Sequence, residues 1–332
     1  MMTGINKNRR IAIACQGGGS HTAFTAGVLK TFLKQKEYSI VALSGTSGGA
    51  ICALLAWYGL LMRERDLGVE LLDSFWKDNS ASSMGEILLN DWMVWVAGLR
   101  STVVMPEISP YLYPSWAQDE VKRMLEKHVE FEKIEKLVQP SSPMLIVGAV
   151  DILSGEFKVF KNAQVTADAI LASAAVPTLF RAVQMGNGLY WDGLFSQNPP
   201  IRDLPDADPD EIWVVQIDPH RRKAEPKTVA EIHDRRNELA GNLSLNQEIY
   251  FIEKINELVN RKLLVGSKYK FINVRRIEMS RDLDYASKLD RSSSFIQELM
   301  AYGEEQAEDF LKTGADPPRI QGQSQVLAGQ RG

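Results

Sequence analysis

Short apolar runs recur along the chain, and each of the first two ends in a glycine-rich stretch. The run at residues 10–15 is followed by Gln16-Gly17-Gly18-Gly19, and the run at residues 38–43 is followed by Gly45-Thr46-Ser47-Gly48-Gly49. Unbroken apolar runs of this length are typical of strands that are buried on both faces of a parallel sheet. Helical periodicity follows both glycine turns. The pattern therefore predicts two consecutive strand, turn and helix units.

The same rhythm returns later in the chain. Apolar runs at residues 144–150 and 212–217 predict two further buried strands, and Ser154-Gly155 predicts a hairpin after the first of them. The spacing of apolar residues predicts helices over residues 243–264 and 295–311. Strands that alternate with helices predict the α/β class with a mostly parallel sheet.

The length of 332 residues suits one large α/β domain or two small ones, and we predict one domain over residues 10–313. Residues 1–9 are a short basic extension, and the apolar run after them is too short for the core of a signal peptide. Residues 314–332 contain Gly, Gln, Pro and Ser without a pattern, which predicts a flexible tail.

Residues 63–139 interrupt the α/β rhythm with aromatic and methionine side chains between proline breaks. This segment is either an ordinary helical layer or an apolar cap, or lid, over the functional site. A cap of this composition would accept an acyl chain or meet a lipid surface. The aromatic and methionine residues are Trp76, Trp92, Met93, Trp95, Met105, Tyr111, Tyr113 and Trp116.

Composition narrows the class of protein. A formal net charge of −4 without a basic stripe argues against nucleic acid as a partner. Cys15 and Cys52 lie in apolar runs, which indicates buried thiols and a reducing compartment such as the cytoplasm. The longest apolar stretch, residues 48–62, is shorter than the roughly 20 residues that span a bilayer. No spacing typical of a metal site occurs, and we expect no metal and no cofactor.

The motif G-x-S-x-G at residues 45–49 predicts a nucleophile elbow, in which Ser47 projects from a sharp strand-to-helix turn. Gly45 and Gly49 suit the crowded backbone of such a turn. The amide of Gly48 would then face a negative oxygen that forms beside Ser47. The alternative is a glycine-rich turn in which Ser47 is only the N-cap of the helix.

The triple glycine Gly17-Gly18-Gly19 exposes backbone N–H groups that can surround an anion. A close-packed turn and a nucleotide phosphate loop are the alternatives. The spacing G-x-G-x-x-G is absent, because Thr22 stands at the third glycine position, and the lysine of a Walker loop is missing. Loops that follow neighbouring parallel strands gather at one edge of a sheet, so we expect this loop to face Ser47.

Asp192, in the stretch Leu189-Tyr190-Trp191-Asp192-Gly193, is the candidate catalytic acid or base. An acid between two aromatic residues and a glycine is unusual for packing alone. The alternative is a turn aspartate, which Asp-Gly favours. Asp151, at the end of the predicted strand 144–150, is a second candidate that ranks below Asp192.

The three stretches Gln16-Gly17-Gly18-Gly19, residues 45–49 and Asp192-Gly193 resemble the patatin-like phospholipase family in content, order and position. Residues 172–180 also resemble the segment that this family has between its nucleophile and its acid. The similarity covers roughly residues 10–220. This chain departs from the family pattern at Ser20-His21-Thr22, at Phe180-Arg181-Ala182 and at Leu194.

The resemblance implies a three-layer α/β/α sandwich and an acyl-ester hydrolase that works through an acyl-enzyme. It implies a Ser-Asp dyad in which Ser47 is the nucleophile and Asp192 the base. The partner would be a lipid or another hydrophobic ester, with peripheral contact to a membrane. The oligomeric state stays open. The implied oxyanion hole consists of backbone amides from Gly17, Gly18, Gly19 and Gly48.

Three alternatives stay open beside the dyad. A Ser-His-Asp hydrolase would use His220, the one histidine that follows a predicted strand in the order Ser, Asp, His. A catalytically silent binding protein would keep the fold without the reaction. An acyltransferase would pass the acyl group to an alcohol or a thiol in place of water.

Overall fold

The computed structural model describes residues 8–313, apart from residues 100–108, 113, 178, 223, 267 and 282. The predicted tail at residues 314–332 and most of the predicted extension at residues 1–9 lie outside the described part. No helix within the described part combines the length and the apolar character that crossing a membrane requires.

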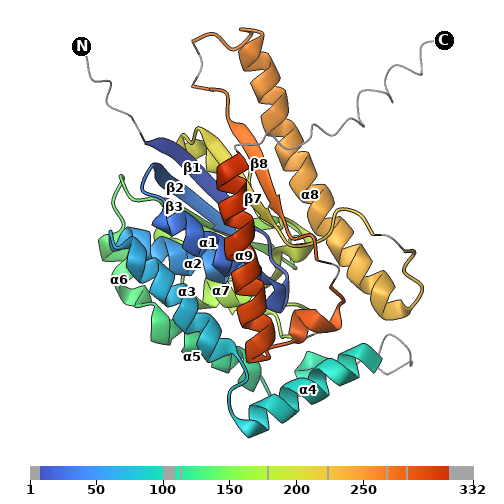
Figure 1. The fold of residues 1–332 in the computed structure, drawn as a ribbon. Helices are drawn as coiled ribbons and strands as arrows, with labels where there is room; N and C mark the ends of the chain where they lie inside the picture. Colours follow the sequence, from blue (N-terminus) through green and yellow to red (C-terminus); the bar gives the residue numbers. More distant parts are fainter. Residues whose placement is uncertain are drawn as a thin grey trace, which may run out of the picture.

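The described residues form one eight-stranded sheet, in which the pairing runs β5-β6-β3-β2-β1-β7-β8 and β4 also pairs with β3 (Figure 1). Five strands are parallel to one another: β1 (Arg9–Cys15), β2 (Tyr38–Gly45), β3 (Met144–Asp151), β7 (Glu211–Gln216) and β8 (Asn273–Glu278). Three strands pair antiparallel: β4 (Phe157–Lys161), β5 (Val183–Met185) and β6 (Gly188–Asp192). The predicted mostly parallel sheet is confirmed.

Strand β3 has an unusual set of neighbours. β4 covers residues 146–150 of β3, while β2 covers residues 144–147 and β6 covers residues 149–151. A strand has only two edges, and β4 overlaps in register with both other strands, so β2 and β6 must share the opposite edge. Strand β6 therefore continues the line of β2 beyond the residue at which β2 ends.

Each face of the sheet is covered by helices, which confirms the predicted α/β/α sandwich. Along β1, Ile11 and Ile13 belong to one core cluster, whereas Ala12 and Ala14 belong to the other. This alternation follows from the two-residue period of a strand. The first cluster contains the helices α1 (Ala23–Lys34), α2 (Gly48–Leu61), α3 (Arg65–Asn79), α5 (Trp116–His128), α6 (Phe131–Leu137), α7 (Ala167–Ser173) and α9 (Ser293–Thr313).

The second face is covered by α8 (Val229–Asn260), whose residues Leu245, Ile249 and Ile252 pack on the sheet (Figure 1). This helix begins well before the predicted residue 243. Its start is stabilised by a capping box, in which the Thr228 side chain accepts from the amide of Glu231 and the Glu231 side chain accepts from the amide of Thr228.

The segment predicted as a cap, residues 63–139, contains helices of two kinds. Helix α3 belongs to the core layer, where Leu72 and Phe75 are buried. Helix α4 (Met84–Leu99) instead extends from the body of the molecule, at the end where the parallel strands finish (Figure 1). Helix α4 contributes no described residue to either core cluster, and a cap over the functional site stays a prediction.

Candidate active site

Ser47 occupies the sharp turn between β2 and α2. Its backbone has φ 56° and ψ −132°, a strained conformation for a residue with a side chain. A Cβ on Gly45 would lie 2.5 Å from the Gly49 carbonyl oxygen, and a Cβ on Gly49 would overlap the Cys15 carbonyl. Only glycine fits at either position, so the G-x-S-x-G spacing reflects this geometry.

Asp192 ends β6 on the same edge of β3 as β2. Gly45 pairs with Val147 and Asp192 pairs with Ala149, so the two residues lie two register positions apart, or about 7 Å. Ser47 follows Gly45 by two residues. The sheet therefore brings the Ser47 hydroxyl and the Asp192 carboxyl together, although they are 145 positions apart in the sequence.

The Asp192 carboxyl is fully buried, whereas Ser47 is 8% exposed. Burial raises the pKa of Asp192 to about 7, while the nearby Ser47 hydroxyl and the Leu194 amide lower it and the charge of Asp218 raises it. Oδ1 accepts a hydrogen bond from the Leu194 amide at 2.8 Å. Oδ2 makes no hydrogen bond of ordinary geometry with any described residue. The pair thus lies close together, with one carboxylate oxygen left without a formed bond.

The triple-glycine loop lies against this elbow. A Cβ on Gly17 would lie 2.8 Å from the Cβ of Ser47, and a Cβ on Gly48 would overlap the Thr22 hydroxyl and approach the Gly19 carbonyl. Within the described part of the chain, the amides of Gly18, Gly19 and Gly48 donate no hydrogen bond. Two glycine turns therefore meet beside Ser47 with free N–H groups.

Gly17 differs from the other predicted oxyanion donors. Its amide donates to the Asn198 side-chain oxygen at 2.7 Å, so this N–H is occupied. The prediction for Gly17 is corrected accordingly: the residue permits close approach to Ser47 but has no free donor in this structure. Sequence reasoning could not anticipate this bond, because it joins residues 181 positions apart.

A buried amide network holds the loop from behind. The Gln16 side chain donates to the Asn198 carbonyl and to the Asn242 side chain, and its oxygen accepts from the amides of Ile217 and Asp218. Gln16 was not singled out in the sequence. Its position directly before the triple glycine was the only signal available.

Ser173 was also missed as a functional residue. Its hydroxyl accepts from the Ser47 amide at 2.9 Å and donates to the Gly148 carbonyl at 2.6 Å. The backbone of the elbow is therefore tied to β3 through this one side chain. Residues 172–180 were noted for their resemblance to a family segment, but the pattern gave Ser173 no role.

The departures at residues 20–22 and at Leu194 have structural roles here. Thr22 donates to the Gly19 carbonyl at 2.6 Å, which fixes the loop, and the Leu194 amide binds Asp192. His21 is buried and its ring nitrogen bonds the Ser287 hydroxyl. Burial, together with the charge of Lys288, lowers the pKa of His21 to about 3, so its ring is neutral at physiological pH.

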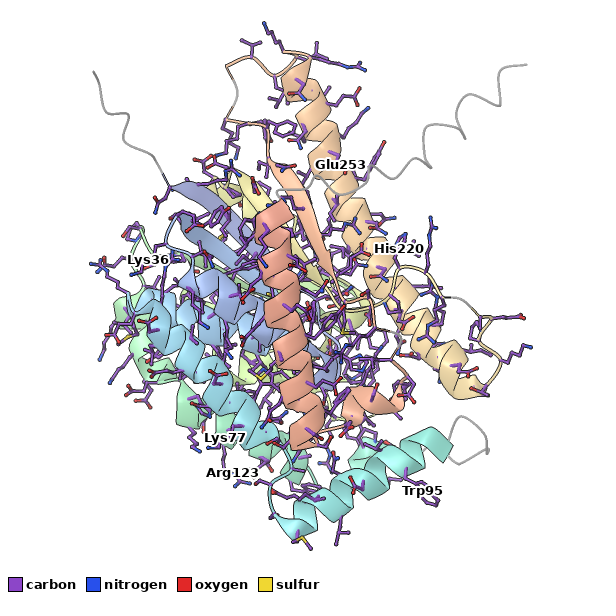
Figure 2. All side chains as sticks on the ribbon, viewed as in Figure 1. Lys36, Lys77, Trp95, Arg123, His220 and Glu253 are labelled. Carbon is purple, nitrogen blue, oxygen red and sulfur yellow. The ribbon has the colours of Figure 1, made fainter. Side chains whose placement is uncertain are left out.

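The other candidates from the sequence make no hydrogen bond to Ser47 or Asp192 among the described residues. His220 is exposed and lies in the loop after β7 (Figure 2), and among the described residues no hydrogen bond joins a histidine to Ser47 or Asp192. Asp151 accepts from the amides of Leu153 and Ser154, as a turn aspartate does. No cluster of three or more His, Cys, Asp or Glu side chains in the described ranges is arranged to hold a metal ion.

A separate cavity of about 690 Å³ lies beside α8, where Phe251, Ile255 and Ile272 line it. None of its lining residues belongs to the elbow, the glycine loop or the end of β6. This cavity is therefore distinct from the candidate site.

Residues 13–205, more than half of the chain, match the family described as patatin-like phospholipase. A search of the curated proteins finds none that matches. Solved structures that match this chain include VipD from Legionella pneumophila (12% identity, TM-score 0.46) and the type III effector protein ExoU (15% identity, TM-score 0.37). The alignments cover 92% and 91% of this chain, but 67% of the VipD chain and 53% of the ExoU chain.

Proposed function

The chain belongs to the patatin-like phospholipase family, and from this premise we propose that it is a serine acyl-ester hydrolase in which Ser47 and Asp192 form the catalytic dyad. One observation carries the proposal. A strained serine and a fully buried carboxyl with an unbonded oxygen lie together, beside three free backbone amides. Such a combination lowers the stability of the folded state, and it suits acyl transfer chemistry.

In the proposed reaction the Ser47 Oγ attacks the ester carbonyl carbon while its proton passes to Asp192. The carbonyl oxygen becomes an oxyanion, and in this proposal the amides of Gly18, Gly19 and Gly48 stabilise it, at about 3 kcal/mol per donor. The C–O bond then breaks, and the alcohol leaves with the proton from Asp192. Water, deprotonated by Asp192, hydrolyses the acyl-enzyme and restores both groups.

The raised pKa of Asp192 explains how a carboxylate could replace histidine. A general base works best when its pKa lies near the operating pH, and an ordinary aspartate with a pKa near 4 is too weak a base. Burial brings the pKa of Asp192 to about 7, close to that of imidazole. The rate should therefore rise with pH through about 7, as Asp192 loses its proton.

For the substrate we propose a lipid ester presented at a membrane or micelle surface. Met84, Leu88 and Trp95 lie on one side of α4 at i, i+4 and i+11, with exposed fractions of 78%, 66% and 61%. Figure 2 shows Trp95 projecting away from the rest of the molecule. A Trp-containing apolar helix face is typical of peripheral contact with lipid.

Helix α4 is linked to the candidate site through the segment around residues 286–291. The Asn90 side chain bonds Asp290 and the Arg291 amide, and the carbonyl of Lys288 packs on Gly19. The proposed lipid contact and the glycine loop therefore belong to one continuous end of the molecule.

The dyad is tested with a fluorophosphonate probe and with three variants. We expect an adduct on Ser47 in the folded wild-type protein, no adduct in Ser47→Ala, and a loss of about 10³-fold or more in kcat for Asp192→Asn. His220→Ala should keep wild-type activity. A protein inactivated only by His220→Ala would replace the dyad with a Ser-His-Asp site, and folded protein without an adduct would indicate a silent binding protein.

The acyl acceptor and the substrate are tested together. A panel of esters with varied acyl length and head group, assayed for fatty acid release, should give the highest kcat/KM for long-chain lipid esters. Addition of an alcohol acceptor measures how the acyl-enzyme divides between water and alcohol. Predominant transfer to the alcohol would make the protein an acyltransferase with the same site.

A further inference from the structure

Helix α8 carries an apolar stripe on the side turned away from the sheet. The five members have exposed fractions between 40% and 63%. They are Val229, Ile232, Leu239, Leu243 and Tyr250. The helix lies along one border of the molecule, and no other helix or strand of the described part of the chain covers its outer side (Figure 1). A stripe of this length is unusual on the surface of a monomer.

The stripe follows a heptad repeat, although contact with the sheet does not require one. If Val229 is position a, the a positions are residues 229, 236, 243 and 250, and the d positions are residues 232, 239, 246 and 253. The stripe occupies five of these eight positions. The other three are Arg236, Asn246 and Glu253. The repeat spans about 36 Å, which is more than three heptads.

The order of polar residues favours an antiparallel arrangement of two such helices. In a parallel pair, Arg236 would face Arg236 of the second copy and Glu253 would face Glu253, and like charges repel. In an antiparallel pair, each residue at an a position faces a residue at a d position of the second copy, and the two residue numbers sum to 482. Arg236 then faces Asn246, a neutral polar side chain whose oxygen also accepts a hydrogen bond from Arg276 at 2.8 Å, so no like-charged residues of the repeat face each other in this layer.

The same register pairs the apolar residues with one another. Leu239 faces Leu243 and Ile232 faces Tyr250, so four of the eight layers are apolar on both sides. Val229 faces Glu253 only in the outermost layers, where the carboxylate stays in water. Arg236 and Glu253 are exposed, and neither has an ion-pair partner within the described part of the chain. In this antiparallel register, apolar residues therefore face apolar residues and polar residues face polar residues in every layer except the two outermost ones.

We infer that the outer stripe of α8 is a self-association surface, on which a second copy of this chain packs as an antiparallel two-stranded coiled coil. The two-fold axis passes next to residue 241. Gly241 packs against Asn198 on the sheet side of the same helix, and Asn198 binds the Gly17 amide. Dimerisation would thus stabilise α8 close to Gly241, where the helix contacts Asn198 and, through it, the glycine loop. The inference does not depend on the proposed function.

The oligomeric state of the full chain tests the surface directly. Sedimentation velocity over about 1 to 100 µM should show a species of twice the 37.2 kDa chain mass, with a Kd at or below about 10 µM. The double variant Leu239→Glu and Leu243→Glu should weaken the dimer by about 100-fold or more, with an unchanged circular dichroism spectrum because both side chains are exposed.

The control variant Leu263→Glu and Val265→Glu removes two exposed apolar side chains outside the stripe and should leave the dimer intact. A wild-type monomer at 100 µM, or equal weakening by the control variant, would overturn the inference.

Single cysteines test the register, and the native Cys15 and Cys52 do not interfere because both are buried. A mixture of Val229→Cys and Glu253→Cys chains should form a mixed disulfide on mild oxidation. Glu253→Cys alone should not cross-link, since in the antiparallel pair its two copies lie about 36 Å apart. A disulfide from Glu253→Cys alone would show a parallel pair and would refute the antiparallel arrangement.

Discussion

The Asp192 carboxyl has conflicting effects on stability and on the proposed activity. Its pKa of about 7 in the folded protein exceeds the ordinary value of 3.8, so the folded state keeps a proton that the unfolded state has lost between these two pH values. Stability therefore falls as pH rises through this window, and the full cost is present above about pH 7. A residue with this behaviour is retained for a reason other than stability.

Asp192→Asn should consequently stabilise the fold while it abolishes the proposed activity. Asparagine is uncharged, so the variant should exceed wild type in unfolding free energy by up to about 4 kcal/mol at pH 8 and by much less at pH 4. Urea denaturation of both proteins at the two pH values measures the difference. A gap that is constant or shrinks with rising pH would contradict the assigned ionisation of Asp192.

Ser173 is the second residue whose role can be isolated, because its hydroxyl joins the Ser47 amide to the Gly148 carbonyl. Ser173→Ala removes a bond to the strained elbow, and we expect kcat to fall about 10-fold to 100-fold with little change in KM. Reactivity of Ser47 toward the fluorophosphonate probe should fall in parallel. Ser74→Ala, on the exposed side of α3, is the matched control.

At the scale of elements, α4 gives a prediction that separates surface contact from chemistry. Leu88→Ser with Trp95→Ser should lower the rate on phospholipid vesicles about 10-fold or more, because less apolar area enters the lipid. The rate on a water-soluble short-chain ester should not change. Leu153→Ser with Val265→Ser removes apolar side chains of similar exposure elsewhere and should affect neither rate. Equal losses on both substrates would contradict a role of α4 in lipid contact.

The helices and strands could be predicted from the sequence wherever the side chains that they bury are apolar. The runs at residues 10–15 and 144–150 were recognised as strands because residues 11–15 and 145–149 are buried on both faces, which leaves no polar position among them. The first half of α8 was missed for the opposite reason. Its sheet side carries Asp234, Glu238 and Asn242, so the periodicity that indicates a buried helix face is absent there.

On the sheet side of the first half of α8, a buried cluster of charged side chains takes the place of apolar residues. This cluster joins distant parts of the chain. Lys288 lies 3.2 Å from Asp218 and 2.8 Å from Asp234, and it also faces Glu238. Two further cations, Arg222 and Arg235, bind the same acids. Three positive and three negative side chains thus balance one another, and their acids hold the pKa of Lys288 above its ordinary value despite its burial.

Lys288→Met should destabilise the whole molecule, because it leaves Asp218 and Asp234 buried without their shared cation. We expect a loss of about 3 kcal/mol in unfolding free energy at pH 7, measured by urea denaturation. Lys34→Met, at an exposed position, should change it by no more than about 0.5 kcal/mol. A neutral effect of Lys288→Met would mean that this cluster contributes no net stability.

At the scale of the whole molecule, local sequence patterns were sufficient to indicate the candidate residues. They were not sufficient to predict that these residues lie close together. The G-x-S-x-G motif and the isolated acid indicated Ser47 and Asp192, since each residue type is unusual in its local setting. Their proximity depends on β6 pairing with β3 beyond the end of β2, which no local pattern encodes. The hydrogen bond between the Gly17 amide and the Asn198 side chain could not be predicted from the sequence for the same reason.

The shared edge of β3 also determines which length changes this protein can tolerate. Ser47 and Asp192 are each set by a separate register with β3, so residues added to the hairpin turn at 152–156 leave the spacing of the two groups untouched. A single residue inserted within residues 188–192 would instead turn the carboxyl to the opposite face of the sheet. Natural or engineered relatives should therefore vary freely in loop length and never in the count of residues along this strand.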